Sequence, residues 1–283
     1  MRKVIDTNFL KSDKLREYLS DPENLAVIPD FVVMETLKGG DPSSICNQFK
    51  ILAEHPKQVI ILKTTHAVGG LRGRRSGRGL QRRLTDKEQT AAFKQFCEKL
   101  EQAKNGDAAC RKQLAGKCEA AAVDLDVMAK TQETYAANLA EHAKKYTEAE
   151  LAILTKGKPI PEELLSKITG EILAVADTMF LVHPYFKKQP PLKKLSNAFL
   201  FRYAVAGYVV ALRCLKEGGP NGASAEKIRN QIIDAMLVAY STYFDGFLSA
   251  DKRAQDIHET TSELLKFYHR DIRLFEEQGL ASG

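Results

Sequence analysis

Short apolar runs alternate with helix-like segments over the first 65 residues, and this alternation limits the possible folds more than any other feature of the sequence. The pattern predicts strands at 2–5, 25–28 and 58–63, and helices at 8–19, 30–38 and 42–54. Strands that alternate with helices pair in parallel through right-handed crossovers. The sequence therefore predicts an α/β fold with a small parallel sheet.

The end of the chain returns to the same pattern. We expect a helix from about 225 to 243, a strand at 246–250 and a final helix from about 252 to 278. The final strand is expected to lie beside the first, which gives a central sheet of about four strands. Side chains at the ends of these two strands would then be neighbours.

The residues between these two parts show helical spacing throughout. They predict a large all-helical insertion, residues 85–217, packed on a discontinuous core formed by 1–65 and 218–283. An Arg- and Gly-rich loop at 66–84 is expected to separate the core from the insertion.

Composition and targeting signals favour a folded cytoplasmic protein. Hydrophobic residues make up 44% of the 283 residues, and Met1-Arg2-Lys3 leads directly into the first strand without a secretory signal. The apolar stretch from Phe199 to Leu215 contains two arginines and is too short for a membrane span, so we expect a buried helix and no membrane partner. The five cysteines have no metal-ligand spacing and are expected to be reduced thiols.

Four acidic residues stand in contexts that suit one site. Asp6 follows Val-Ile at the end of the first strand and precedes Thr-Asn, and Glu35 lies in the helix after the second strand. Asp234 falls in the run Ile-Ile-Asp-Ala, and Asp251 closes Ser-Ala-Asp after the last strand. This order of acids resembles the PIN-domain nuclease family. The resemblance covers residues 1–65 and 224–255.

The resemblance implies a PIN-like three-layer fold and a metal-dependent nuclease. Asp6, Glu35, Asp234 and Asp251 would hold Mg²⁺ or Mn²⁺, which are hard cations that prefer oxygen ligands. The cation would polarise the phosphate and activate a water for attack. Asn8 is expected to orient a neighbouring carboxylate through its amide.

Each acid also has a structural alternative. Asp6 and Asp251 could cap the helices that follow them, and Glu35 could be a solvated helix residue. Asp234 lies in an apolar run, where an uncompensated charge is costly, so a partner or a metal is expected there. Asp30 is expected to cap the helix that carries Glu35.

The basic loop is the second informative feature. Arginines suit phosphate because their planar guanidinium groups form paired hydrogen bonds, and glycines leave the backbone free. The alternative is a solvated surface loop. The predicted nucleic-acid-binding residues are Arg72, Arg74, Arg75, Arg78, Arg82 and Arg83.

The sequence thus predicts a metal-dependent endonuclease, and the resemblance favours RNA over DNA as the substrate. A structure-selective FEN-like DNA nuclease and a catalytically inactive nucleic-acid-binding module are the alternatives. The apolar helices of the insertion leave a homodimer open, and a regulatory protein partner is open as well.

Overall fold

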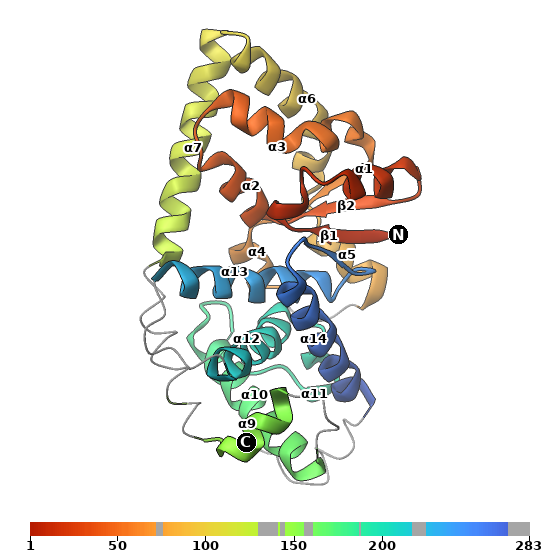
Figure 1. The fold of residues 1–283 in the computed structure, drawn as a ribbon, viewed down its shortest axis with the longest axis vertical. Coiled ribbons are helices and arrows are strands. Elements are labelled where there is room, and N and C mark those ends of the chain that lie inside the picture. Colours follow the sequence, from red (N-terminus) through yellow and green to blue (C-terminus); the bar gives the residue numbers. More distant parts are fainter. Residues whose placement is uncertain are drawn as a thin grey trace. The chain divides into compact units, whose positions relative to one another are not determined.

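The computed structural model describes residues 1–71, 76–129, 141, 145–155, 161–186, 188–216 and 225–270 (Figure 1). Contacts divide the chain into two units. The first comprises Met1–Val68, Gly77–Ala129 and Tyr243–Gln255, and the second comprises Gly69–Ser76, Lys130–Thr242 and Asp256–Gly283.

The first unit is built on a four-stranded sheet in which every strand pair is parallel. The strand order is β3-β2-β1-β4, and the strands are β1 (Arg2–Ile5), β2 (Leu25–Ile28), β3 (Val59–Ile61) and β4 (Phe247–Leu248). Val4 pairs with Val27 on one side and with Phe247 on the other. The predicted α/β class, the parallel sheet and the pairing of the first strand with the last are confirmed.

The last strand is shorter than the predicted range of 246–250. It ends after Leu248 because the next residues are held by a side chain: the backbone N–H of Ala250 donates to Oδ1 of Asn8, 2.8 Å away. Before the strand, Gly246 has φ +145°, a conformation that favours glycine. The start of β4 therefore follows the glycine conformation at Gly246, and its end is set by the hydrogen bond from Ala250 to the distant Asn8.

The segment predicted as one helix at 8–19 forms two elements, the 3₁₀ turn η1 (Thr7–Phe9) and α1 (Asp13–Ser20). They separate at Ser12, whose hydroxyl accepts a hydrogen bond from the N–H of Lys14 and so caps α1. The next two helices, α2 (Asp30–Leu37) and α3 (Pro42–Glu54), confirm the predicted ranges. Asp41 caps α3 by accepting from the N–H of Ser44.

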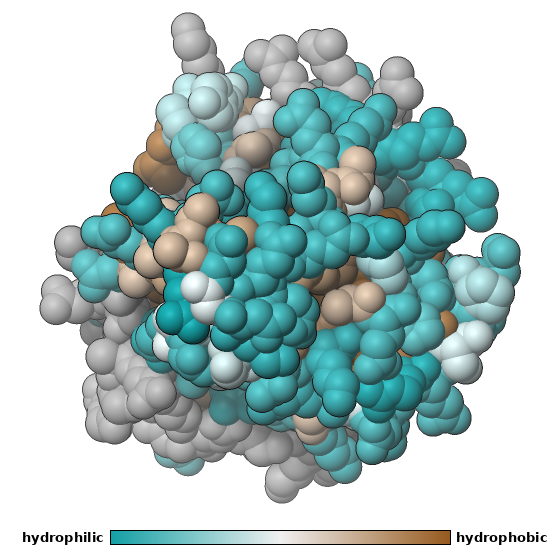
Figure 2. All heavy atoms as spheres, turned by 90° about the horizontal axis from the view of Figure 1, so that it is seen from above, coloured by the Kyte–Doolittle hydropathy of each residue, from teal (hydrophilic) through white to brown (hydrophobic). Residues whose placement is uncertain are grey.

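A helical hairpin, α6 (Lys87–Lys104) and α7 (Ala108–Ala129), completes the first unit. Its first helix packs on α3 through edge-on contacts of Phe49 with Phe93 and Phe96, and α7 packs on α2 and α6. Seen from the hairpin's side, the described residues present mostly hydrophilic side chains with small apolar areas between them (Figure 2). The hairpin lies within the range predicted as the insertion, but its contacts group it with the sheet. The boundaries of the two units therefore differ from the predicted domain boundaries.

The basic region predicted as a loop at 66–84 is partly helical, and that prediction was wrong in this respect. It contains the end of α4 (Thr65–Gly69) and the whole of α5 (Gly77–Leu84). Leu80 and Leu84 are buried and hold α5 on the first unit. A buried pair four residues apart favours a helix with its basic residues on the other side. Arg72, Arg74 and Arg75 lie outside the described residues.

The regular elements described in the second unit are all helices. They are α9 (Glu148–Thr155), α10 (Glu162–Val182), α11 (Leu192–Leu195), α12 (Phe199–Lys216), α13 (Ala225–Ser241) and most of α14 (Lys252–Arg270), whose first turn belongs to the first unit. α12 is at the centre, since α9, α10 and α13 all pack on it.

The predicted buried helix at 199–215 is confirmed as α12, and its arginines are accommodated by polar partners. The buried guanidinium of Arg202 donates to the carbonyl of Ser196 at 2.7 Å and to the carbonyl of Thr242, while Arg213 lies 3.5 Å from Asp256. Within the described ranges, no helix is long and apolar enough to cross a membrane. All five cysteines are free, as expected.

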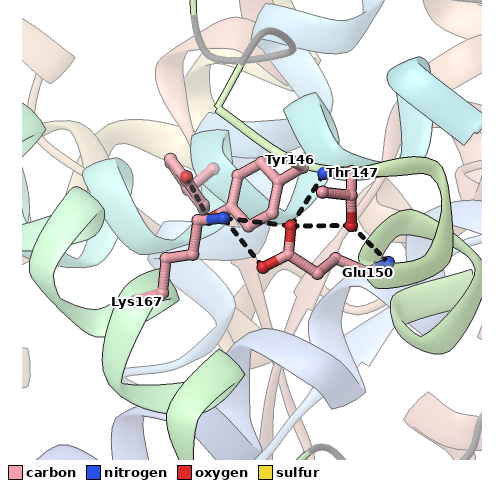
Figure 3. A network of polar contacts seen from close by, with 5 residues as sticks. Tyr146, Thr147, Glu150 and Lys167 are labelled. Atoms are coloured by element: carbon pink, nitrogen blue, oxygen red, sulfur yellow. Dashed lines mark hydrogen bonds and ion pairs between the residues drawn. The ribbon is translucent and has the colours of Figure 1, made fainter.

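A polar network at the start of α9 holds together three segments of the second unit (Figure 3). Lys167 of α10 lies 2.8 and 3.0 Å from the two carboxylate oxygens of Glu150, which also accepts from the N–H of Thr147 at 2.7 Å. The hydroxyl groups of Tyr146 and Tyr208 lie 2.6 Å apart, which ties the network to α12. Glu150 therefore has its own positive partner within the fold.

Candidate functional site

The carboxyl edge of the sheet gathers three of the four predicted acids. Asp6 directly follows β1, and Asp251 follows β4 by three residues. Because the two strands are parallel neighbours, these residues leave the sheet on the same edge. The backbone N–H of Asp6 donates to the carbonyl of Leu248 at 2.9 Å, so Asp6 is held directly beside the end of β4.

Ser249 connects the ends of the two strands. Its hydroxyl donates to Oδ2 of Asp6 at 2.6 Å and accepts from the N–H of Asp251 at 3.0 Å. The hydroxyl lies 3.3 Å from both the amide nitrogen and the carbonyl oxygen of Asn8. Since its one proton is used toward Asp6, the Asn8 contact is best described as the amide donating to Ser249. Ser249 thus fixes the orientation of the Asp6 carboxylate.

The predicted role of Asn8 is therefore corrected. Within the part of the chain that the structure describes, its hydrogen bonds go to Ser249 and to the N–H of Ala250, and none of them reaches a carboxylate. The reason is the early end of β4, which leaves the N–H of Ala250 without a partner in the ladder. Asn8 orients Asp6 indirectly, by holding the segment that carries Ser249.

Glu35 reaches the same edge from α2, the helix that follows β2. It is exposed, and one of its oxygens, Oε2, accepts a hydrogen bond of 2.6 Å from the hydroxyl of Thr7. Thr7 directly follows Asp6, so this bond places Glu35 beside the end of β1. A solvated helix residue would not need this contact, and Glu35 is better described as part of the cluster.

Helix capping was the structural alternative for both Asp6 and Asp251, and the structure shows it only for Asp251. Asp6 stands at the N-cap position of η1, but its side chain makes no capping hydrogen bond. Oδ1 of Asp251 accepts from the N–H of Arg253 at 2.7 Å, which is the hydrogen bond of a helix cap for α14. Capping therefore accounts for one oxygen of Asp251 and does not account for Asp6.

Asp6 is a buried carboxylate in a negative environment. Only 7% of the residue is exposed, and burial raises the pKa of Asp6 above its usual value. Hydrogen bonds from Ser249 and from the backbone of Thr7 lower the pKa, while the negative charges of Glu35 and Asp251 raise it further. No positively charged group stands among the main causes of this pKa shift.

This arrangement has the donor chemistry of a divalent-cation site but not a complete set of protein ligands. The described residues include no group of three or more His, Cys, Asp or Glu side chains placed to hold one metal ion. Mg²⁺ commonly takes only one or two carboxylates and completes its coordination with waters and phosphate oxygens. Asp6 as one ligand, with Glu35 or Asp251 acting through water, is compatible with that mode.

Asp234, the fourth predicted acid, belongs to the second unit. It lies on α13 and is half-buried among the apolar residues Ile233, Ala235 and Leu237, all of which are buried. Asp234 also has an interaction partner in the structure. Its place in the metal site stays a prediction.

Asp30 is a buried carboxylate that has a structural explanation. The predicted cap position of α2 is occupied by Pro29, and Asp30 is the first residue of the helix. Its oxygens accept from the N–H of Thr65 at 2.6 Å and from the Thr65 hydroxyl at 2.9 Å. Burial raises the pKa of Asp30, and these hydrogen bonds oppose the shift. Asp30 therefore joins the segments that follow β2 and β3.

The described arginines of the predicted nucleic-acid-binding set lie on α5. Arg78 and Arg82 are exposed, and Arg83 is half-buried. α5 is fixed by Gln81, which accepts from the Arg2 guanidinium at 2.9 Å and donates to the carbonyl of Tyr243 at 2.7 Å. The two exposed arginines are thus presented from a well-anchored helix, and contact with nucleic acid stays a prediction.

Two residues of the cluster were not among the predicted site residues. Ser249 and Thr7 each donate a hydrogen bond of 2.6 Å to a carboxylate. The sequence signal was present, because Thr follows Asp6 and Ser stands two residues before Asp251. Their hydroxyl groups could have been predicted as the orienting donors.

Comparison with known proteins adds no relative: no family model, no curated protein and no solved structure matches the chain.

Proposed function

We propose that this chain is a metal-dependent, PIN-like endonuclease that hydrolyses phosphodiester bonds in RNA. The observation that carries the proposal is the environment of Asp6. It is buried at the carboxyl edge of a parallel sheet, beside two further acids and with no positive partner among the described residues. An unpaired buried charge is costly, and such sites are frequently functional.

A bound Mg²⁺ or Mn²⁺ would neutralise this cluster, polarise the scissile phosphate and lower the pKa of a bound water. Asp6 is the residue that would hold the ion directly. Its carboxylate is oriented by Ser249, so little rearrangement is needed when the ligand arrives. The orientation of Ser249 depends in turn on Asn8.

Glu35 and Asp251 would act on water and on the substrate. Thr7 occupies one oxygen of Glu35, and the exposed carboxylate can accept a hydrogen bond from an attacking water through the other. Asp251 uses Oδ1 for capping, and Oδ2 can accept from a metal-bound water. The chain's own contribution is thus to hold one oxygen of each carboxylate with a donor: Ser249 for Asp6, Thr7 for Glu35 and the N–H of Arg253 for Asp251.

The basic residues support a nucleic-acid substrate over a small phosphate ester. Arg78 and Arg82 are exposed on α5, in the same unit as the carboxylates. Phosphate contacts by such residues raise affinity without reading the sequence, whereas the carboxylate cluster would supply the chemical step. The preference for RNA over DNA comes from the family resemblance.

The test is cleavage of end-labelled single-stranded RNA, hairpin RNA and single-stranded DNA, with Mg²⁺, Mn²⁺ or EDTA. The wild-type chain should cut RNA internally with either metal and be inactive in EDTA. Asp6→Asn should lose at least about a thousandfold in rate, since a metal ligand contributes several kcal/mol to the transition state. Asp13→Asn is the matched control, because the Asp13 side chain is 96% exposed and should leave the rate unchanged.

A catalytically inactive nucleic-acid-binding module is the second candidate. It is favoured by the absence, within the described ranges, of three acids placed to hold one ion. This candidate predicts binding of the same RNAs without metal-dependent cleavage by the wild-type chain. Equal cleavage by wild type and Asp6→Asn would contradict the assignment of Asp6 to the active site, and loss of that cleavage on further purification would show that it came from a contaminating nuclease.

A further inference from the structure

The helix α7 is apolar on two opposite faces. Its inner face packs within the first unit, where α7 contacts α2 and α6, and it buries Leu114, Ala121 and Leu125. A surface helix ordinarily carries polar residues opposite its buried face. In α7 the opposite face carries four exposed residues without a polar side chain, spaced by four, three and four positions, which keeps them on one side of the helix. We call them the outer stripe: Gly116, Ala120, Val123 and Val127.

The packing of the chain itself does not explain the outer stripe. Val123 and Val127 are 58% and 57% exposed. A Cβ atom at Gly116 would have open space before it, because nothing among the described residues beyond its own part of the helix lies within 4 Å. Valine and glycine are weaker helix formers than the lysine or glutamate that an exposed helix position usually carries. Neither the helix nor its inner packing therefore requires these residues.

The exposed charges of α7 are separated along the helix. The first half, 108–118, has no acid and contains Arg111, Lys112 and Lys117. The second half, 119–129, has no base and contains Glu119, Asp124 and Asp126. All six residues are exposed. The helix dipole favours acids near the start of a helix, and the first turn of α7 has none, so the basic first half is not explained by α7 alone.

A second copy of the helix running in the opposite direction suits both observations. Each basic half would then face the acidic half of the other copy, with the two outer stripes between them. A two-fold axis near the middle of α7 gives this arrangement, and two-fold pairs are the commonest homodimers. A parallel pair would instead place like charges together. Gly116 and Ala120 lie near the axis, where their small size lets two helices approach closely.

We propose that the outer stripe of α7 is a homodimer interface, in which two copies of the chain pack this helix antiparallel. The apolar residues supply the buried area, and the charged halves determine the direction of packing. One pair of helices buries less area than a standard interface, so the dissociation constant should be on the order of 10 μM. The dimer needs neither a metal ion nor nucleic acid.

Sedimentation velocity of the full chain, in EDTA and without nucleic acid, tests the interface. Between about 1 and about 200 μM, wild type should change from monomer to dimer. Val123→Lys should weaken the dimer at least about tenfold, because it places a charge in the apolar contact, and lysine keeps the helix since it is a better helix former than valine. Ala122→Lys is the matched control: it adds the same charge at an exposed neighbouring position outside the outer stripe, and it should dimerise within about twofold of wild type.

Charge reversal tests the direction of packing. Lys112→Glu together with Lys117→Glu makes the first half acidic, so an antiparallel dimer should weaken at least about tenfold. Adding Glu119→Lys and Asp124→Lys to the same chain exchanges the two halves, restores the net charge of wild type and should restore the dimer. In a parallel pair, like charges would face each other in all three proteins, and neither change would follow this pattern.

Three results would each overturn the inference. They are a wild-type chain that stays monomeric at about 200 μM, equal effects of Val123→Lys and Ala122→Lys, and no recovery in the chain with all four charge reversals. The nuclease proposal is tested separately, because Asp6→Asn should dimerise like wild type whether or not the chain cleaves RNA.

Discussion

Asp6 in the first unit and Glu150 in the second are both carboxylates held by hydrogen bonds. The charges beside them have opposite signs. Glu150 lies against Lys167 and accepts from the backbone of Thr147, and these contacts hold its pKa below the usual value (Figure 3). Asp6 is buried beside Glu35 and Asp251, and burial raises its pKa. Glu150 has its positive partner within the fold.

The comparison separates a structural carboxylate from a candidate ligand. A carboxylate that serves the fold is satisfied by donors of the fold, as Glu150 and Asp30 are. Asp6 also has a donor, the Ser249 hydroxyl, which orients it, but unlike Asp30 it lies beside two further acids, Glu35 and Asp251, whose charges raise its pKa. We propose that a divalent cation from the solvent neutralises this cluster.

The largest expected difference between the two carboxylates is in catalysis. Asp6→Asn should reduce metal-dependent RNA cleavage at least about a thousandfold, and Glu150→Gln should leave it within about twofold, because only Asp6 is placed at the carboxyl edge of the sheet. Single-turnover cleavage with saturating enzyme measures both. A comparable loss in the two variants would mean that the effect is one of folding.

The second largest expected effect is the change in the free energy of unfolding when a divalent cation is added. Mn²⁺ at a hundred times its dissociation constant should raise the free energy of unfolding of the wild-type chain by about 2.7 kcal/mol, because a ligand that binds only the native state stabilises it. Asp6→Asn should show little of this increase, whereas Glu150→Gln should retain it. Urea unfolding with and without Mn²⁺ is the measurement, and an equal response in all three proteins would remove Asp6 from the site.

Loss of the orienting hydroxyl should have a smaller effect. Ser249→Ala removes the hydrogen bond that lowers the pKa of Asp6, so that pKa should rise and the acidic limb of the pH–rate profile should move to higher pH. We expect a loss of about tenfold at neutral pH, because a hydrogen bond to a charged group contributes about 1.5 kcal/mol or more. Ser249→Thr keeps the hydroxyl and is the control. An unshifted acidic limb would show that Ser249 does not control the ionisation of Asp6.

The smallest effects concern stability in the absence of metal. The folded-state pKa of Asp6 is raised, so its favourable contribution is complete below the unfolded value of 3.8 and is lost as pH rises through the folded value. Asp6→Asn should therefore be more stable than wild type at neutral pH, by on the order of 1 kcal/mol.

Glu150 should show the opposite sign. Its folded-state pKa is lowered, so its contribution is present above the unfolded value of 4.5 and is lost as pH falls through the folded value. Glu150→Gln should be slightly less stable than wild type at neutral pH, and the difference should vanish in acid. Urea unfolding in EDTA from pH 3 to 8 measures both variants. The same sign for the two substitutions at neutral pH would break the comparison.

The parallel sheet could be predicted because each of its strands is indicated by a short stretch of the sequence. The run at 25–28 is apolar, the segment at 2–5 ends in Val4-Ile5, and a helical segment separates the two; each formed a strand with the expected ends. The pairing of β1 with β4 followed from the order of strands and crossovers. β4 itself was overestimated, since its end depends on Asn8, which is 242 residues away from Ala250 in the sequence.

The site was predicted less completely than the sheet. The acids at the ends of β1 and β4 could be located because strand ends are readable from the sequence. The sequence did not show which donor binds each carboxylate, because Ser249 and Thr7 form their hydrogen bonds with residues far away in the chain. The helix α5 was also missed, because its glycines and arginines concealed the spacing of Leu80 and Leu84, which is only decisive once both are seen to be buried.

The most direct test of the central claim is a crystal structure of the chain soaked with Mn²⁺, with anomalous data collected near the manganese absorption edge. Our account predicts an anomalous peak within about 2.5 Å of a carboxylate oxygen of Asp6, and no such peak in crystals of Asp6→Asn treated in the same way. A peak at other residues with Asp6 uncoordinated, or no peak at millimolar Mn²⁺, would contradict the assignment of Asp6 as a metal ligand.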